Sequence, residues 1–179
     1  AYHGNYNKCN EVLSNYRNVK GYNEAVSSKD DNSVELLIPN NDDCGSIAVD
    51  SKDIEMKNEN WSKGNFSTKV LTVSLEKILY RAGGFIDYMK VDCETSEYAL
   101  LMGKDLSKIG IIAIEIHCQL GEKKVNALTE HINITHRLIT KYSKDIGFKV
   151  NKNQQVYFQN NNYKVEPHNI FYKLIKKIF

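Results

Sequence analysis

The sequence lacks a long apolar run, a strong excess of either charge and any closely spaced pair of cysteines. No stretch approaches the roughly 20 consecutive apolar residues of a membrane-spanning helix, so we expect no membrane span. The net charge is +2, from 24 basic and 22 acidic residues, which gives no indication of a nucleic-acid partner. The four cysteines include no CxxC pair, the spacing typical of structural zinc sites, so we expect no zinc site.

What the sequence does contain is typical of a folded domain. The 179 residues are 41% hydrophobic and 26% charged, a composition that can bury a core. A chain of this length favours one domain, which we take to span residues 1–179. We see no internal repeat.

Hydrophobic periodicity predicts strands and helices in alternation. The predicted strands are Val19–Val26, Val34–Ile38, Lys69–Val73, Ile86–Val91, Ile109–Ile116, Phe148–Val150, Val156–Gln159 and Ile170–Leu174. The predicted helices are Cys9–Tyr16, one beginning after Ser74 and ending at Gly83-Gly84, one near Ser96–Met102, and one at about Lys123–Ile146. This order indicates an α/β fold with parallel central strands and a terminal antiparallel pair.

Acidic residues follow two of the most apolar strands. Asp92 comes directly after Ile86–Val91, and Glu115 and His117 close the run Ile109–Ile116. Because ligands of open α/β sheets bind beyond the carboxyl ends of the strands, these side chains, together with Glu94, are candidates for one site. The alternative is that Asp92 or Thr95 only caps the next helix. We interpret Glu97 as a first-turn acid favoured by the helix dipole.

The central block resembles the FkbM-type methyltransferases. YMKVDCETSEYALLMG and the following IGIIAIEIH fit their pattern of a strand running into K-[IV]-D-x-E-G-x-E, an apolar helix and a strand ending in E-[IV]-H. The matching residues are Lys90, Val91, Asp92, Glu94, Glu97, Glu115 and His117. Weaker similarity extends over most of the chain.

This resemblance implies a Rossmann-like class I methyltransferase fold, a mostly parallel sheet with one antiparallel strand at its C-terminal edge. It also implies S-adenosylmethionine as cofactor and a hydroxyl oxygen of a sugar or natural product as acceptor. Asp92 would lie beside both cofactor and acceptor, and Glu94, Glu115 and His117 would shape the acceptor pocket. The positions that the resemblance assigns to the cofactor are His3, Glu24, Ala25, Val26, Gly45, Ser46 and Asp92.

Two features depart from the family pattern. Thr95 stands where the motif has glycine. The glycine loop that follows the first strand of class I methyltransferases is missing, and His3 stands in place of the acid that holds the ribose. We therefore expect the N-terminal first strand of the sheet to be absent from these residues, and an upstream part of the protein or a partner chain to cover the open sheet edge.

Our leading hypothesis is an S-adenosylmethionine-dependent O-methyltransferase acting on a sugar, glycan or related polyol. His117 is the base best matched to neutral pH. Asp92 would orient the acceptor or, with Glu94 and Glu115, hold a divalent metal through oxygen ligands. The alternative is a methyltransferase-like domain without catalysis that serves as a structural or interaction module, which the missing glycine loop favours.

Overall fold

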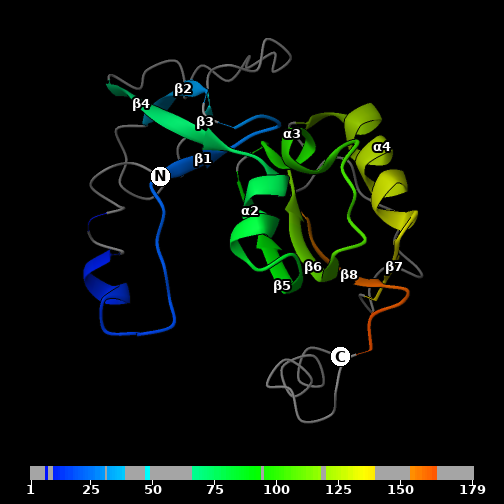
Figure 1. Ribbon diagram of the computed structural model, residues 1–179. Coiled ribbons are helices and arrows are strands. Elements are labelled where there is room, and N and C mark those ends of the chain that lie inside the picture. The colour runs from blue at the N-terminus through cyan, green and yellow to red at the C-terminus, as the bar shows by residue number, and fades with distance from the viewer. Residues whose placement is uncertain are drawn as a thin grey trace. The chain divides into compact units, whose positions relative to one another are not determined.

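The computed structural model describes residues 7, 10–30, 32–38, 47–48, 66–93, 95–117, 120–139 and 154–164. The chain divides into two compact units, Ala1–Lys77 and Ile78–Phe179, each containing one sheet (Figure 1). The α/β class is confirmed, since the described chain combines helices with strands, and the two alternate between residues 66 and 138. The prediction of a single domain over residues 1–179 stays a prediction.

The first unit contains a four-stranded mixed sheet. Its strands are β1 (Glu24–Val26), β2 (Ser33–Ile38), β3 (Ile47–Ala48) and β4 (Phe66–Val73), in the order β1-β4-β2-β3. β1 runs parallel to β4, whereas β2 runs antiparallel to both β4 and β3. The strand predicted over Val19–Val26 is shorter than expected, because Gly21 and Asn23 disfavour strand structure and β4 pairs only with the last three residues. Residues 10–13 are helical, in agreement with the helix predicted there.

A small apolar cluster and a set of polar contacts hold this unit together. Val34 and Val70 are buried against each other, and Ala25 packs on them. At the end of β4, both oxygens of the Asp30 carboxylate accept hydrogen bonds from Ser74, one from its backbone N–H at 2.6 Å and one from its hydroxyl at 3.0 Å. The Ser74 hydroxyl also accepts from the backbone N–H of Lys77 at 3.3 Å, as an N-cap residue does. This confirms the predicted helix start, where α2 (Leu75–Arg81) begins.

The second unit contains the other sheet. After α2 follow β5 (Ile86–Val91), α3 (Glu97–Leu101), β6 (Ile109–Ile116), α4 (Glu122–Asn133), β7 (His136–Leu138) and β8 (Gln154–Asn160), with strand order β5-β6-β8-β7. β5 is parallel to β6, and β8 is antiparallel to both of its neighbours, so β5, β6 and β7 run in one direction and β8 alone in the other (Figure 1).

The sequence analysis predicted one antiparallel strand, which is β8, but the predicted place of that strand at the edge of the sheet was wrong. β8 lies between β6 and β7, not at the edge, because residues 136–138 form an additional strand that pairs with it. The predicted single, mostly parallel sheet also differs from the described strands, which form two mixed sheets. The sheet of the first unit is mixed because β2 pairs antiparallel with β4 over the full length of β2.

The helix predicted from Lys123 to Ile146 ends much earlier than expected. α4 stops at Asn133, and the chain enters β7 at His136. The imidazole Nε2 of His136 lies 3.0 Å from the carbonyl oxygen of Ile109, and the backbone N–H of Asn161 donates to the carbonyl of Thr135 at 3.0 Å. These contacts fix residues 135 and 136 to the sheet and override the helical periodicity. The strands predicted at Phe148–Val150 and Ile170–Leu174 lie outside the described residues.

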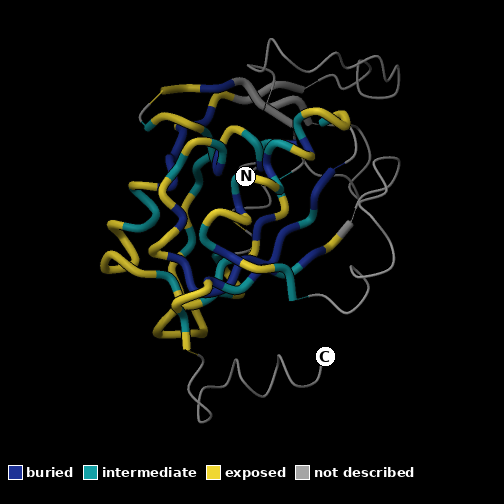
Figure 2. Tube along the Cα trace, turned by 90° about the vertical axis from the view of Figure 1, so that its right-hand side faces the viewer, coloured by how far each residue is buried: buried dark blue, intermediate teal, exposed yellow. Residues whose placement is uncertain are grey.

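β6 forms the centre of the core of the second unit. Its residues Ile109 to Ile114 and Ile116 are buried, with β5 on one side and β8 on the other, as predicted for a strand that is apolar on both faces. α3 and α4 contribute buried leucine and isoleucine side chains, and the Lys124 ammonium of α4 lies 5.6 Å from the centre of the Tyr98 ring of α3. Figure 2 colours the described residues by burial, and the longest unbroken buried run among them is residues 109–114 of β6. Among the residues described, no helix is long and apolar enough to cross a membrane.

Candidate functional site

The carboxyl ends of β5 and β6 lie side by side. Val91 is paired with Ile114, so the next residues along the two parallel strands are Asp92 and Glu115. Both acids are accessible: the side chain of Asp92 is 36% exposed, and Glu115 is half-buried, although the residues before it in β6 are fully buried. The structure therefore brings these two predicted residues to one edge of the sheet.

A lysine accompanies the two acids. The ammonium Nζ of Lys90 lies 2.6 Å from Asp92 Oδ2, an ion pair on the surface. The hydrogen bond to Asp92 raises the pKa of Lys90, and the charges of Asp92 and Glu115 add to the effect. We call these three residues the rim cluster. An exposed ion pair of this kind contributes only about 0–1 kcal/mol to stability, so its main effect is to orient the Asp92 carboxylate.

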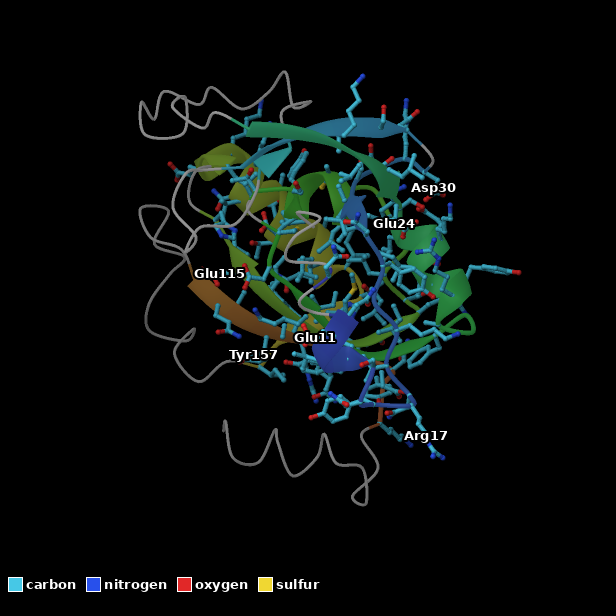
Figure 3. All side chains as sticks on the ribbon, turned by 90° about the vertical axis from the view of Figure 1, so that its left-hand side faces the viewer. Glu11, Arg17, Glu24, Asp30, Glu115 and Tyr157 are labelled. Carbon is cyan, nitrogen blue, oxygen red and sulfur yellow. The ribbon has the colours of Figure 1, made fainter. Side chains whose placement is uncertain are left out.

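Polar and aromatic side chains continue the rim cluster across the same face of the sheet. Glu115 is paired with Gln155 on β8, whose amide Nε2 donates to the phenol oxygen of Tyr157 at 3.1 Å. Tyr88 of β5 belongs to this row, and burial, followed by the nearby Tyr157, raises its pKa. Figure 3 labels Glu115 and Tyr157, which come from the neighbouring strands β6 and β8. This face offers hydrogen-bond donors and acceptors as well as ring surface.

His117, the fourth predicted residue, has a buried partner that the sequence analysis did not identify. Its Nδ1 lies 2.7 Å from Glu97 Oε1, and the two side chains are only 3% and 0% exposed. The same carboxylate oxygen accepts a hydrogen bond from the backbone N–H of Cys93 at 3.3 Å. Glu97 is the first residue of α3, as predicted, but its carboxylate faces the end of β6 rather than solvent. The one sequence signal for it is its place as the last acid of the matched motif.

Two buried polar atoms in the segment from Thr95 to Glu97 have no hydrogen-bond partner among the residues that the structure describes. One is Oε2, the second carboxylate oxygen of Glu97, and the other is Thr95 Oγ1. Thr95 is only 9% exposed and has a φ of +78°, the left-handed conformation that glycine adopts without strain. Buried polar atoms are usually satisfied, so such a pair of atoms in one short segment indicates either strain or a site for a polar group.

The remaining predicted residues divide into two groups. Glu24, Ala25 and Val26 form β1 in the first unit, where they are half-buried and paired with residues 71–73 of β4. His3, Gly45, Ser46 and Glu94 lie outside the described residues. Within the described part of the chain, no three His, Cys, Asp or Glu residues form a group that could hold a metal ion.

Comparison with known protein families assigns the chain to one of them. The family model described as the methyltransferase FkbM domain matches residues 3–150, which is most of the sequence and includes the rim cluster, Glu97 and His117. Neither the curated proteins nor the solved structures gave a match. The strand ends that carry Asp92, Glu115 and His117 are therefore part of a matched methyltransferase domain, and the chain belongs to the FkbM methyltransferase family, whose members use S-adenosylmethionine.

Proposed function

We propose that this domain transfers a methyl group to a hydroxyl oxygen of a sugar, a glycan or a related small polyol. The observation that carries the proposal is the pair of accessible carboxylates, Asp92 and Glu115, at adjoining strand ends of an FkbM domain. Carboxylates accept hydrogen bonds from hydroxyl groups, and the neighbouring Gln155 and Tyr157 can both donate and accept. A polyol carries several hydroxyl groups at a spacing that such a row can bind.

The described residues fit S-adenosylmethionine at Asp92. This cofactor carries its methyl group on a positively charged sulfonium, and a partly exposed carboxylate at a strand end is a suitable neighbour for a cation. Asp92 is the residue of the second unit that would hold the cofactor.

In the proposed mechanism the protein orients the acceptor and removes its proton. Glu115 and Asp92 accept hydrogen bonds from acceptor hydroxyls, and Lys90 keeps the Asp92 carboxylate in place. His117 accepts the proton that the attacking hydroxyl loses, since an imidazole is the base best matched to neutral pH. Holding both reactants in one orientation and excluding water contributes most of the rate enhancement in reactions of this kind.

The first test uses cofactor binding and methyl transfer by the full-length protein. S-adenosylhomocysteine should raise its melting temperature, because a ligand that binds only the folded state stabilises it. Radiolabelled S-adenosylmethionine and a panel of mono- and disaccharides should give labelled sugar. Asp92→Asn should keep the fold and lower the rate about 100-fold or more.

The matched control is Asp105→Asn. Asp105 is also exposed, and it bonds only locally, accepting from the backbone N–H of Ser107 at 2.9 Å. This variant should keep full activity. If the folded wild-type protein binds no S-adenosylhomocysteine at millimolar concentration, the enzyme hypothesis fails and the alternative of a non-catalytic module replaces it. If Asp92→Asn and Asp105→Asn are equally active, the rim cluster is structural.

A further inference from the structure

We propose that the rim cluster selects the acceptor by its charge, so that the substrate is a neutral sugar or an amino sugar and not an acidic one such as a uronic acid. Glu115 is the residue that determines this specificity. The selection rests on the proposed function, in which a sugar hydroxyl is the acceptor, and it narrows the class of that sugar.

Three polar side chains form a row across the strand ends of the second sheet. Asp92 follows the last paired residue of β5, Glu115 is its neighbour on β6, and Gln155 on β8 is paired with Glu115. Because neighbouring strands are about 4.8 Å apart, the row spans about 10 Å, which is room for one sugar ring and its substituents. Asp92 and Gln155 are exposed and Glu115 is half-buried, so a ligand can reach all three.

This row carries a net negative charge. The Lys90 ammonium lies 2.6 Å from Asp92 Oδ2 and compensates that carboxylate. Within the described part of the chain no cation forms an ion pair with Glu115, although the charge of Glu115 does act on Lys90 at longer range. Gln155 is uncharged, and burial raises the pKa of Tyr88 above 10.0, so this phenol is also uncharged at neutral pH. One uncompensated carboxylate, that of Glu115, therefore remains.

Arg137 of β7 is a further cation on this face of the sheet, but it lies far from the row. It is paired with Gln159, which is four residues along β8 from Gln155. Four residues of a strand measure about 13 Å, more than the Debye length of about 8 Å at physiological salt. The charge of Arg137 is thus largely screened at Glu115. An anionic substituent of the acceptor meets repulsion there, whereas a hydroxyl or a protonated amine can donate a hydrogen bond to the carboxylate.

A role in stability alone does not account for Glu115. The other residues of β6 (Ile109–Ile116) are buried, so an apolar side chain would suit this strand better. Asp92 and Glu115 are like charges on neighbouring strands, an arrangement that destabilises a sheet, and Lys90 compensates only one of them. The carboxylate of Glu115 is better explained by its effect on a ligand than by a gain in stability.

The experiment compares acceptors that share a ring and differ in charge. The kcat/KM for methyl transfer by the full-length protein is measured for glucose, galactose and mannose, each as the neutral sugar, the protonated amino sugar and the uronic acid. We expect the neutral and amino sugars to exceed the uronic acid by about tenfold or more, as for one charge–charge contact near a protein surface. At about 1 M NaCl, where the Debye length is about 3 Å, this preference should largely disappear.

Two substitutions in the rim cluster should shift the preference in opposite directions. Glu115→Gln removes the uncompensated charge and should bring the ratio of kcat/KM for neutral and acidic sugars close to one, chiefly through KM. Lys90→Gln leaves Asp92 uncompensated and should raise the ratio by about a further tenfold. Because each ratio is taken within one variant, a general loss of rate cancels.

Glu130→Gln is the matched control, since it removes the same charge elsewhere in the second unit. Glu130 is exposed near the end of α4. The chain then enters β7 at His136, whose imidazole Nε2 lies 3.0 Å from the carbonyl oxygen of Ile109. Ile109 begins β6, so this end of α4 lies at the opposite end of that strand from Glu115. The control should keep the ratio of the wild type.

The charge selection and the proposed function fail in different ways. If the wild type methylates none of these sugars, the proposed function is wrong. If it methylates uronic acids as well as neutral sugars, or if folded Glu115→Gln keeps the ratio of the wild type, the charge selection alone is wrong. Should Glu115→Gln not fold, the salt dependence of the wild type decides, and a ratio that high salt leaves unchanged overturns the selection.

Discussion

Replacement of Thr95 by glycine should stabilise this protein. Thr95 has a φ of +78°, and a residue with a Cβ in the left-handed region costs about 1–2 kcal/mol. Its buried hydroxyl has no hydrogen-bond partner in the described part of the chain, which costs about 1–3 kcal/mol more. Thr95→Gly removes both terms, and the FkbM pattern has glycine at this position.

Two losses offset part of this gain. Removing the buried methyl group costs about 0.8 kcal/mol, and the greater freedom of glycine in the unfolded chain costs about 0.5–1 kcal/mol. With the middle value of each term, the free energy of unfolding should therefore rise by about 2 kcal/mol. At a urea dependence of about 2 kcal/mol per M this moves the unfolding midpoint up by roughly 1 M.

Urea unfolding followed by far-UV circular dichroism measures the shift. Thr95→Ala is the matched control, because it removes the hydroxyl and methyl group but keeps a Cβ in the left-handed conformation. It should be less stable than Thr95→Gly by about 1 kcal/mol. A glycine variant with a midpoint at or below that of the wild type would refute the assignment of strain to this position.

Two further predictions concern the second unit. Gly110→Ala should lower the free energy of unfolding by about 1–3 kcal/mol, measured by urea denaturation. A Cβ at this position would lie 2.7 Å from the carbonyl oxygen of Asp87 and 2.8 Å from the Tyr163 ring. An unchanged free energy of unfolding would contradict this close approach. Burial lowers the pKa of His136, so the unfolded chain binds more protons below the ordinary histidine pKa of 6.5 and stability should decrease as the pH falls below that value. Thermal unfolding between pH 7 and pH 5 should show this dependence weakened in His136→Gln but not in the control His131→Gln, and equal slopes in all three proteins would contradict it.

The elements that sequence reasoning placed correctly are those whose signal is local. β6 is an uninterrupted apolar run, and such a run has few alternatives to a central strand. The start of α2 follows from the capping ability of Ser74, and its end from Gly83 and Gly84, which both have positive φ. The acids that follow β5 and β6 were identified because the carboxyl ends of parallel strands meet at one edge.

The errors concern contacts between residues far apart in the sequence. The end of α4 depends on the pairing of His136 with Asn160, and nothing in the local periodicity reports that pairing. Glu97 was interpreted from its position in a helix, whereas its burial depends on His117, 20 residues further along the chain. Local patterns specify the type of an element, but the partner across a sheet or core is set by the complete fold.

The position of β8 between β6 and β7 has a consequence for how the protein folds during synthesis. The ribosome completes β6 at Ile116, yet the strand that covers its second edge is complete only at Asn160. At translation rates of about 5–20 residues per second, the most apolar strand of the chain waits seconds for its neighbour. During that interval its free edge can pair with other chains or bind a chaperone. The nascent protein should thus be most prone to aggregation after β6 has emerged and before β8 has been made.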